Sequence, residues 1–478
     1  MTRSGEAVTR SGYSQRVNLD PEDAAARHDG PGRGGLPAPC DHGSVNAPPP
    51  APEPGSAAAR PAPSEQPEPP ALFDRAFIDD PYPAYAWLRE HAPVHRTRLP
   101  NGVEAYLVTR YDDVKAVLAD PRLSKNAAAS FPGWKPGRTG IPGEHRSGIA
   151  AHLLNLDPPD HTRLRRLVAK AFTPRRIADF EPRIRRIADT LLDECAARAA
   201  ADPDGSVDLI RGYACPLPVA VILEMLGVPE EDQAIFHEWA FGVVDRSGPR
   251  GGVGRSVKRI RGYLREIIHK KRLAPGDDLL TALVRASDHG EHLSEDEAAA
   301  MAFILLFAGF ETTINLVGNG YFALLTHPEQ RDRLLTNPGL LPNAVEELLR
   351  YDGPVEFGTW RFTTEPITVG GVAIPAGEPV LAVLAAADRD PSRFAAPDEL
   401  DLGRAATGHV ALGHGIHFCI GAPLARLEGR IAFERLLARY PAAGLARPPE
   451  ALRRHSGLIM RGLYELPVRL EVPSTASV

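Results

Sequence analysis

The sequence predicts a mainly α-helical protein that also contains small β-sheets. Apolar residues recur at helical spacing through long stretches, above all 177–226, 255–287 and 294–326, whereas strand-like runs are few and short. With 478 residues, of which 43% are hydrophobic and 24% charged, the chain can bury a large core. Length alone would divide such a chain into about three domains.

Local signals define the expected elements and their ends. A Ser294-x-x-Glu297 capping box opens the longest helix, and His327-Pro328 ends it. In chain order we expect a helix over 83–91, a strand over 105–109, a helix over 114–118, a long loop over 124–148, a helix through Val168 and Phe172, helices within 177–226 and 255–287, the long helix over 294–326, a helix over 343–351, strands at 367–369 and 380–384, a helix through Leu424 and Leu436, and a strand over 466–470.

Residues 1–70 differ in composition from the rest. They contain 14 of the 47 prolines, and Tyr13 is their only aromatic residue. So little apolar surface cannot offset the entropy lost on ordering, and we expect a disordered Pro/Ala-rich extension. A docking tail for a partner and a misassigned start codon are both consistent with this composition. Order should begin near Leu72.

Charge and cysteine content exclude several classes of protein. A net charge of −6 gives no electrostatic reason to expect nucleic acid or an anionic membrane. The four cysteines are widely spaced and form no disulfide framework, which favours a reducing cytoplasm. The N-terminus has no apolar core of the kind a signal peptide needs, and the longest central apolar run, Ala302–Phe310, is too short to cross a bilayer.

Cys419 lies between glycines and the start of a helix. Gly413, Gly415 and Gly421 would let the backbone fold back, and Pro423 suits a first helical turn. Backbone N–H groups and the positive end of a helix dipole lower a thiol pKa, which favours a thiolate that acts as a metal ligand or a nucleophile. Because no second cysteine lies within 200 residues, zinc is disfavoured, and a lone thiolate suggests axial ligation of haem iron. The alternative is a buried, inert cysteine.

The pattern Gly413-x-Gly415-x-His417-x-Cys419-x-Gly421 resembles the haem-ligand signature of the cytochrome P450 family, and the following Ala-Pro-Leu-Ala-Arg run resembles its bacterial members. The resemblance implies a single P450 domain over 71–478, with haem between the long central helix and the cysteine loop and its helix. The family usually has Phe seven residues before the cysteine, where this chain has Leu412. That substitution bears on the redox tuning of the iron rather than on its identity.

His161 and Arg165 follow a proline-bounded turn and lie four residues apart, so they share one helical face. Two cationic donors there could hold a pair of carboxylates, although without the family an exposed basic face is the better interpretation. In the family, the matching positions bind the haem propionates through charge-assisted hydrogen bonds. The resemblance implies the same role for Arg361 and His417.

Ala308, Glu311 and Thr312 lie on one face of the long helix, so an acid and a hydroxyl face the same space. A carboxylate in so apolar a helix is costly unless it is paired or functional. Taken alone, the pattern favours Thr312 bonding to the carbonyl four residues earlier, with Glu311 reaching a salt bridge. The hexad 308–313 also matches the oxygen-activation motif of the family. That match implies that Thr312 contacts dioxygen, Glu311 relays protons and Ala308 leaves room beside the iron.

Glu347 and Arg350 form an i, i+3 pair, which is a weak signal by itself. Their place about 70 residues before the cysteine matches the structural Glu-x-x-Arg pair of the family. Arg393 and Arg404 are both candidates for the third partner of that pair. By the same resemblance, the substrate pocket is expected to include residues that could equally be core: Phe307, Val355, Phe357, Ile459 and Met460.

The resemblance implies a haem-thiolate monooxygenase that binds haem b (iron protoporphyrin IX). Because the runs 351–355 and 361–366 are similar to those of bacterial members that tailor macrolides and other polyketides, we expect hydroxylation or epoxidation of a hydrophobic secondary metabolite. A steroid, terpene or fatty acid substrate is one alternative, and an oxidase that couples phenols or desaturates is another. A haem-binding sensor or scaffold is the non-enzymatic alternative.

Electrons must come from another protein, because the resemblance uses the chain from Leu72 to Val478 and leaves no G-x-G-x-x-G unit or flavin module. A ferredoxin and an NAD(P)H-dependent ferredoxin reductase are implied. Arg163, Arg166 and Arg426 would offer the ferredoxin a basic docking face. The expected protein is a cytoplasmic monomer that takes molecular oxygen and a hydrophobic small molecule.

Overall fold

The structure, a computed structural model, describes residues 70–133, 150–234, 236, 252–455 and 457–470. The chain divides after Gln66, and all the described residues belong to the second unit, Pro67–Val478. The predicted N-terminal extension lies outside the described residues up to position 69, as does the part of the predicted loop from 134 to 148.

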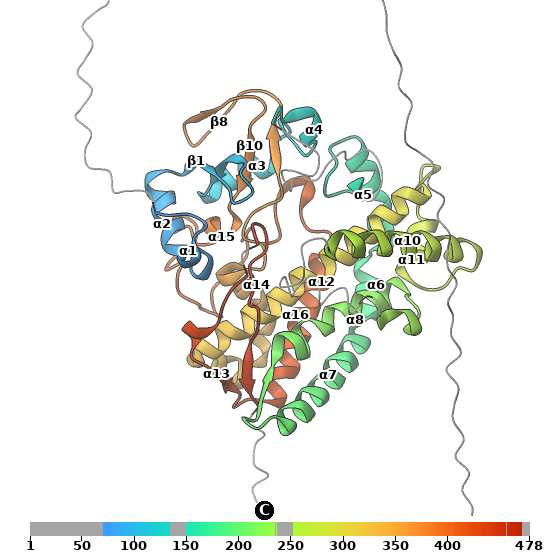
Figure 1. The fold of residues 1–478 in the computed structure, drawn as a ribbon, viewed down its shortest axis with the longest axis vertical. Helices are drawn as coiled ribbons and strands as arrows, with labels where there is room; N and C mark the ends of the chain where they lie inside the picture. The colour runs from blue at the N-terminus through green and yellow to red at the C-terminus, as the bar shows by residue number, and fades with distance from the viewer. Residues whose placement is uncertain (1–69, 134–149, 235, 237–251, 456, 471–478) are drawn as a thin grey trace, which may run out of the picture. The chain divides into compact units, whose positions relative to one another are not determined.

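Helices make up most of the described unit, and the strands are short (Figure 1). The helices are α1 (Arg75–Asp79), α2 (Tyr82–His91), α3 (Tyr111–Ala119), α4 (Ala127–Ser130), α5 (Asp160–Ala171), α6 (Pro174–Asp179), α7 (Glu181–Ala201), α8 (Pro216–Leu226), α10 (Gly252–Leu273), α11 (Leu279–Arg285), α12 (Glu295–Thr326), α13 (Pro328–Thr336), α14 (Leu341–Asp352), α15 (Leu384–Ala387) and α16 (Ala422–Arg439). The strands are β1 (Val94–Arg98), β2 (Glu104–Val108), β3 (Leu123–Ser124), β4 (Ser206–Asp208), β5 (Ser287–Asp288), β6 (Glu291–His292), β7 (Arg361–Thr363), β8 (Ile367–Val369), β9 (Val372–Ile374), β10 (Pro379–Ala382), β11 (Gly444–Leu445) and β12 (Pro467–Arg469). This confirms the predicted fold class.

Helix α12 is the centre of the helical layer. Its predicted capping box is present, since the Ser294 hydroxyl accepts from the Glu297 N–H and the Glu297 carboxylate accepts from the Ser294 N–H. It packs against α8, α10, α14 and α16, and Figure 1 shows it crossing the middle of the molecule beside α16. Helix α12 is long and apolar enough to span a membrane, but 67% of its most apolar window is buried within the protein, as expected of a core helix.

A five-stranded sheet with the order β1-β2-β10-β7-β3 lies beside the helical layer. Strand β10 runs parallel to β2, with Val380 opposite Tyr106, and antiparallel to β7, with Val380 opposite Arg361. Pairing with β10 therefore fixes the start of β7, where Arg361 lies. The smaller sheets are β11-β12-β4 and the hairpins β5-β6 and β8-β9.

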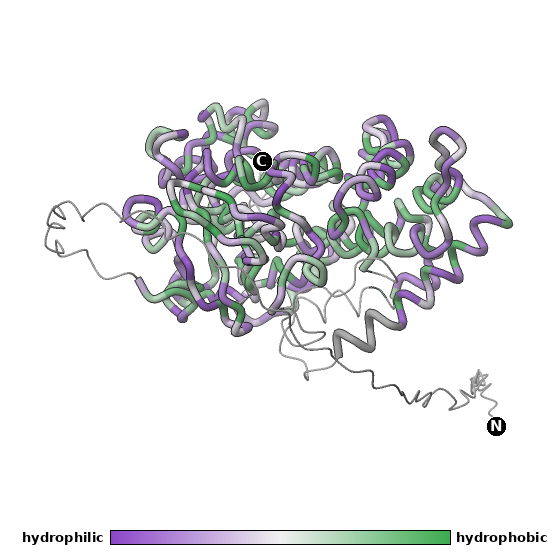
Figure 2. The backbone as a smooth tube through the Cα atoms, turned by 90° about the horizontal axis from the view of Figure 1, so that it is seen from above, coloured by the Kyte–Doolittle hydropathy of each residue, from purple (hydrophilic) through white to green (hydrophobic). Residues whose placement is uncertain are grey.

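Two predicted elements differ from those observed. The predicted helical stretch 177–226 is interrupted by β4 and by a π-helix at Ile210–Ala214, where Gly212 packs so closely that a Cβ would lie 2.8 Å from the Cys195 sulfur. The described part of the predicted loop 124–148 contains the short helix α4. Hydrophobic and hydrophilic segments are interspersed along the helices, as the mixed green and purple of the tube shows (Figure 2).

Candidate active site

The cysteine loop is held by backbone hydrogen bonds on both sides of its turn. The Gly413 N–H donates to the Val410 carbonyl (2.7 Å), and the Cys419 N–H donates to the Leu412 carbonyl (2.9 Å). Gly413 and Gly415 have positive φ (77° and 73°), a conformation that favours glycine, as the sequence predicts. Gly421 has an ordinary φ of −82°, and a Cβ there would lie 3.8 Å from the cysteine sulfur.

Burial raises the pKa of the Cys419 thiol, and this is the largest influence on it. The Gly421 and Ala422 N–H groups, together with Arg165 and Arg426, act in the opposite direction. The backbone donors at the helix start thus lower the thiol pKa as the sequence predicts, but burial outweighs them, so the pKa is raised overall. A coordinated metal ion supplies the missing positive charge and deprotonates a thiol outright.

Cys419 and the central helix α12 line the same cavity, which has a volume of about 1180 Å³. Ala308, Glu311 and Thr312 all line it, so the structure brings the two sequence motifs together across one space. Glu311 is buried, with 7% of its surface exposed. The Thr312 hydroxyl donates to the Ala308 carbonyl (2.7 Å), which is the hydrogen bond expected of a structural threonine. Thr312 nevertheless also lines the cavity.

A cluster of basic side chains lies at one side of this cavity: Arg165, Arg361 and His417 line it, and the His161 ring lies beside that of His417 without lining it. His161 and Arg165 come from α5, Arg361 begins β7, and His417 lies in the cysteine loop. The His161 and His417 rings are 4.4 Å apart between centroids, and Arg165 Nη2 donates to the Phe418 carbonyl (2.8 Å). Arg361 donates from Nη1 to the Thr359 carbonyl at 3.0 Å and is 3% exposed.

Several buried polar atoms of this cluster lack a hydrogen-bond partner among the described residues: both ring nitrogens of His161, Nη1 of Arg165 and Nδ1 of His417. Burial, and after it the neighbouring positive charges, Lys125 first, lower the pKa of His417 to about 2. Burial also lowers the pKa of Arg361 to about 10. Buried donors that have no partner and lie beside positive charges are costly unless anions are close by. The two propionate groups of a haem are anions of this kind. The residues present therefore fit a haem.

Sequence reasoning missed Lys125, which also lines the cavity and is 4% exposed. Its Nζ donates to the carbonyls of Thr359 (3.2 Å) and Trp360 (3.1 Å). The only sequence signal available was a lysine in a segment of otherwise small and polar residues, which does not indicate burial.

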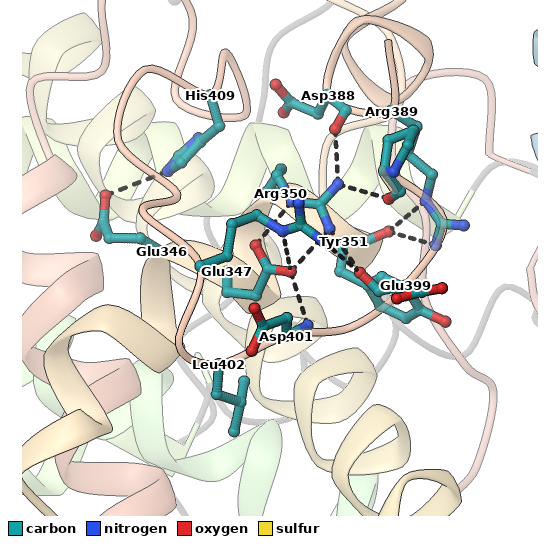
Figure 3. Close-up of polar contacts among 12 residues, drawn as sticks. Glu346, Glu347, Arg350, Tyr351, Asp388, Arg389, Glu399, Asp401, Leu402 and His409 are labelled. Carbon is teal, nitrogen blue, oxygen red and sulfur yellow. Dashed lines mark hydrogen bonds and ion pairs between the residues drawn. The ribbon is translucent and has the colours of Figure 1, made fainter. Parts of the chain in front are cut away.

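The Glu-x-x-Arg pair is buried on α14, and both side chains are fully inaccessible. Arg350 donates to both carboxylate oxygens of Glu347, at 2.7 and 2.8 Å, and to the carbonyls of Asp388 and Glu399 (Figure 3). The third partner is Arg404, whose Nε lies 3.1 Å from Glu347 Oε1. The other candidate, Arg393, donates to the Thr407 carbonyl instead.

This network continues to the cysteine loop through residues that the sequence did not indicate. The Asp388 carboxylate accepts from the Val410 N–H (2.6 Å), and burial raises its pKa to about 6. His409 lies 3.2 Å from Glu346, as Figure 3 shows, and Arg426 donates to the same carboxylate at 2.7 Å. Although burial acts in the opposite direction, Arg426 and His409 lower the pKa of Glu346 to about 2.

The residues expected in the substrate pocket also lie along this cavity: Phe307, Val355, Phe357, Ile459 and Met460. Val355 pairs with Met460 in an isolated antiparallel bridge, which brings the C-terminal segment to the wall after α14. Phe357 is 1% exposed and packs near Tyr85, with 6.3 Å between ring centroids, so it is largely a core residue.

The three arginines expected to form a docking face are each paired with a carboxylate. Arg163 pairs with Glu297, Arg166 lies 3.6 Å from Glu291, and Arg426 pairs with Glu346. These pairs compensate much of their positive charge. On the cysteine loop itself, Ile416 and Phe418 are exposed apolar side chains.

Comparisons with known proteins agree with this geometry. The sequence profile of the family "Cytochrome P450" matches residues 250–461. The vitamin D(3) 25-hydroxylase of Pseudonocardia autotrophica is 47% identical, with 84% of this chain and 96% of that protein aligned. The mycinamicin IV hydroxylase/epoxidase of Micromonospora griseorubida is 41% identical, over 80% of this chain and 94% of that protein.

A solved structure gives the same result for the fold. The bacillaene polyketide synthase cytochrome P450 PksS of Bacillus subtilis is 37% identical and superimposes with a TM-score of 0.75, covering 84% of this chain and 99% of that one. Identity at this level over nearly the full length of the relatives shows common descent. The chain belongs to the cytochrome P450 family of haem monooxygenases.

Proposed function

We propose that this P450 hydroxylates or epoxidises a macrolide or another polyketide. The observation that supports this most directly is one large cavity lined by Cys419, by the Glu311–Thr312 pair, and by Arg165 and His417, which keep buried donors without a partner among the described residues. The relatives named for mycinamicin IV and for bacillaene polyketide synthesis act in polyketide chemistry, which supports the substrate class.

The proposed cofactor is haem b, with Cys419 as the iron ligand. His161, Arg165 and His417 would hold its propionates through buried ring and guanidinium nitrogens that have no other partner among the described residues. Arg361, whose donors already bond to the Thr359 and Leu118 carbonyls, would add its positive charge. When bound, the haem supplies the oxidative chemistry, and the protein supplies position and a dry cavity. Glu311 would take up protons from solvent, and the Thr312 hydroxyl would pass them to the reacting oxygen.

The cavity walls suit a large apolar substrate. Aromatic and aliphatic side chains dominate the part that extends from α12 towards α1: Phe73, Phe77, Phe303, Ile304, Phe307 and Ile459. Such walls bind by excluding water, and a few polar groups then orient the molecule.

Electrons would come from a ferredoxin and its NAD(P)H-dependent reductase in the cytoplasm, with the P450 acting as a monomer. Ile416 is exposed on the cysteine loop, close to the proposed iron ligand, and would be covered by the ferredoxin, whereas its neighbour Phe418 also lines the cavity. Because the arginines nearby are paired, we expect ferredoxin binding to depend only weakly on salt.

Turnover of a substrate panel tests the substrate class. The purified protein, a surrogate ferredoxin, its reductase and NADPH are incubated with macrolactones, glycosylated macrolides, linear polyketides, vitamin D and steroids, and products are identified by mass spectrometry under ¹⁸O₂. We expect one labelled oxygen in a macrolide or linear polyketide product. The 47% identical vitamin D(3) hydroxylase supports a secosteroid as the second candidate, and turnover of vitamin D alone would replace the polyketide proposal.

The iron ligand has its own test, independent of substrate. The reduced carbon monoxide complex should absorb near the strongly red-shifted position that a thiolate ligand causes, and Cys419→Ser should abolish that band. Cys215→Ser is the control, because Cys215 is a buried thiol that does not line the cavity. An unchanged band in Cys419→Ser would rule out Cys419 as the ligand.

A further inference from the structure

Lys125 is a buried lysine whose contacts are all with neutral oxygens. Its side chain reaches from the residue after β3 to the segment just before β7, where Nζ donates to the Thr359 carbonyl, the Thr359 hydroxyl and the Trp360 carbonyl. The same Thr359 carbonyl also accepts from Arg361 Nη1 at 3.0 Å. Lys125 and Arg361 therefore hold the same peptide group from two directions.

The backbone at Lys125 joins a second part of the cluster of basic side chains. The Lys125 N–H donates to Asp157 Oδ1 (2.9 Å), and the Ser124 hydroxyl donates to Asp157 Oδ2 (2.6 Å). The Asp157 carbonyl in turn accepts from the N–H of His161 at the start of α5 (3.0 Å). Ser124 and Lys125 are thus bonded to Thr359, which lies two residues before Arg361, and to Asp157. The Asp157 carbonyl in turn holds the start of α5, the helix that carries His161 and Arg165.

The charge of Lys125 is uncompensated by any direct ion pair. Among the described residues, no carboxylate forms a salt bridge with its Nζ, although Asp157 exerts a favourable field. Burial lowers its pKa well below the usual value, and the neighbouring Arg361 lowers it further. A buried cation with cationic neighbours is costly unless anions lie close by. The two carboxylates of haem are anions of the required kind, and the donors of His161, Arg165 and His417 point to the same need.

We propose that Lys125 is a positioning residue for the haem: it ties the Arg361 segment to the start of α5 and adds a positive charge behind the propionate site. Its three ammonium donors are taken by Thr359 and Trp360, so it would act on the haem indirectly. Lys125 would hold the segment that carries Arg361 in place, and its charge would raise the electrostatic potential at the propionate site. This inference rests on haem binding by the family and not on the identity of the substrate.

The test compares Lys125→Met, which removes the charge and all donors at similar length, with Lys125→Gln, which keeps an amide donor and removes only the charge. Lys270→Met is the matched control, because Lys270 is an exposed lysine on α10 paired with Glu266. Two quantities are measured on the folded holoprotein: the rate of haem transfer to apomyoglobin and the midpoint potential of the haem iron.

We expect haem release to be about tenfold faster in Lys125→Met and less affected in Lys125→Gln, because lost hydrogen bonds loosen the Arg361 segment. Both variants should show a lower midpoint potential, since loss of a buried positive charge favours the ferric state. Release from Lys125→Met at the rate of the control would overturn the positioning role. If Lys125→Met does not fold, Lys125→Gln decides, and an unchanged potential in that variant would overturn the role of the charge.

Discussion

Thr312 combines two features that the sequence presents as alternatives. Its hydroxyl donates to the Ala308 carbonyl at 2.7 Å, and its side chain lines the cavity shared with Cys419. A hydroxyl can rotate away from a helix carbonyl towards a new partner, since it keeps both donor and acceptor capacity. The hydrogen bond to Ala308 is therefore compatible with the proposed catalytic role of Thr312.

Thr312→Ala should leave haem binding intact and uncouple electron use from product formation. Without the hydroxyl, proton delivery becomes less selective, and we expect product formed per NADPH to fall by about tenfold or more while hydrogen peroxide rises. The measurement is the ratio of product and peroxide to NADPH consumed. Thr312→Ser retains the hydroxyl and should restore most of the coupling. Equal coupling in Thr312→Ala and the parent would remove Thr312 from the mechanism.

Individual elements were predictable where their signals are local. The capping box of α12, the glycines before Cys419 and the pair on α14 are short runs whose geometry follows from spacing. The same reasoning could not choose between Arg393 and Arg404, because both lie in the irregular segment between α15 and α16, where no periodicity indicates which side chain is buried. It also missed Lys125, whose burial depends on β3 pairing with β7.

The partner of Glu347 can be tested with these two arginines as a matched pair. Arg404→Gln removes the Nε donor from a carboxylate that is fully buried, and the free energy of unfolding should fall by about 1–3 kcal/mol. Arg393→Gln removes a donor to one carbonyl and should cost at most about 1 kcal/mol. Urea unfolding followed by circular dichroism measures both. A larger loss in Arg393→Gln would reverse the assignment.

At the scale of the whole described unit, residues far apart in sequence meet at one buried carboxylate. Asp352 at the end of α14 accepts from Tyr82 of α2 (2.8 Å), from Arg454 (2.6 Å) and from Arg461 (2.8 Å). Arg461 also donates to the carbonyls of Ile78 and Asp79, the last two residues of α1. This cluster links the first helices to the C-terminal segment that forms part of the cavity wall. Nothing in the local sequence indicates it, because its members are separated by up to 383 positions.

Asp352 should therefore control the stability of the whole unit in a pH-dependent way. Burial acts to raise its pKa, but Arg454, Arg461 and the Tyr82 hydroxyl outweigh that effect and lower it below the ordinary value. A carboxyl with a lowered pKa contributes stability above its unfolded pKa of about 3.9 and loses it progressively as the pH falls further. Asp352→Asn should lower the free energy of unfolding by about 3 kcal/mol at pH 7.5, because two buried arginines lose their counter-charge.

The pH series separates this effect from a general loss of packing. The difference in stability between Asp352→Asn and the parent should be constant from pH 7.5 to about 5 and should shrink below about 4, where Asp352 of the unfolded parent takes up a proton while the folded parent still resists it. Asp398→Asn is the control, since Asp398 pairs with Arg389 at 3.3 Å but its side chain is 64% exposed, and that change should cost less than about 1 kcal/mol. A difference that persists unchanged at pH 3.5 would show that Asp352 acts through its shape and neutral hydrogen bonds rather than through its charge.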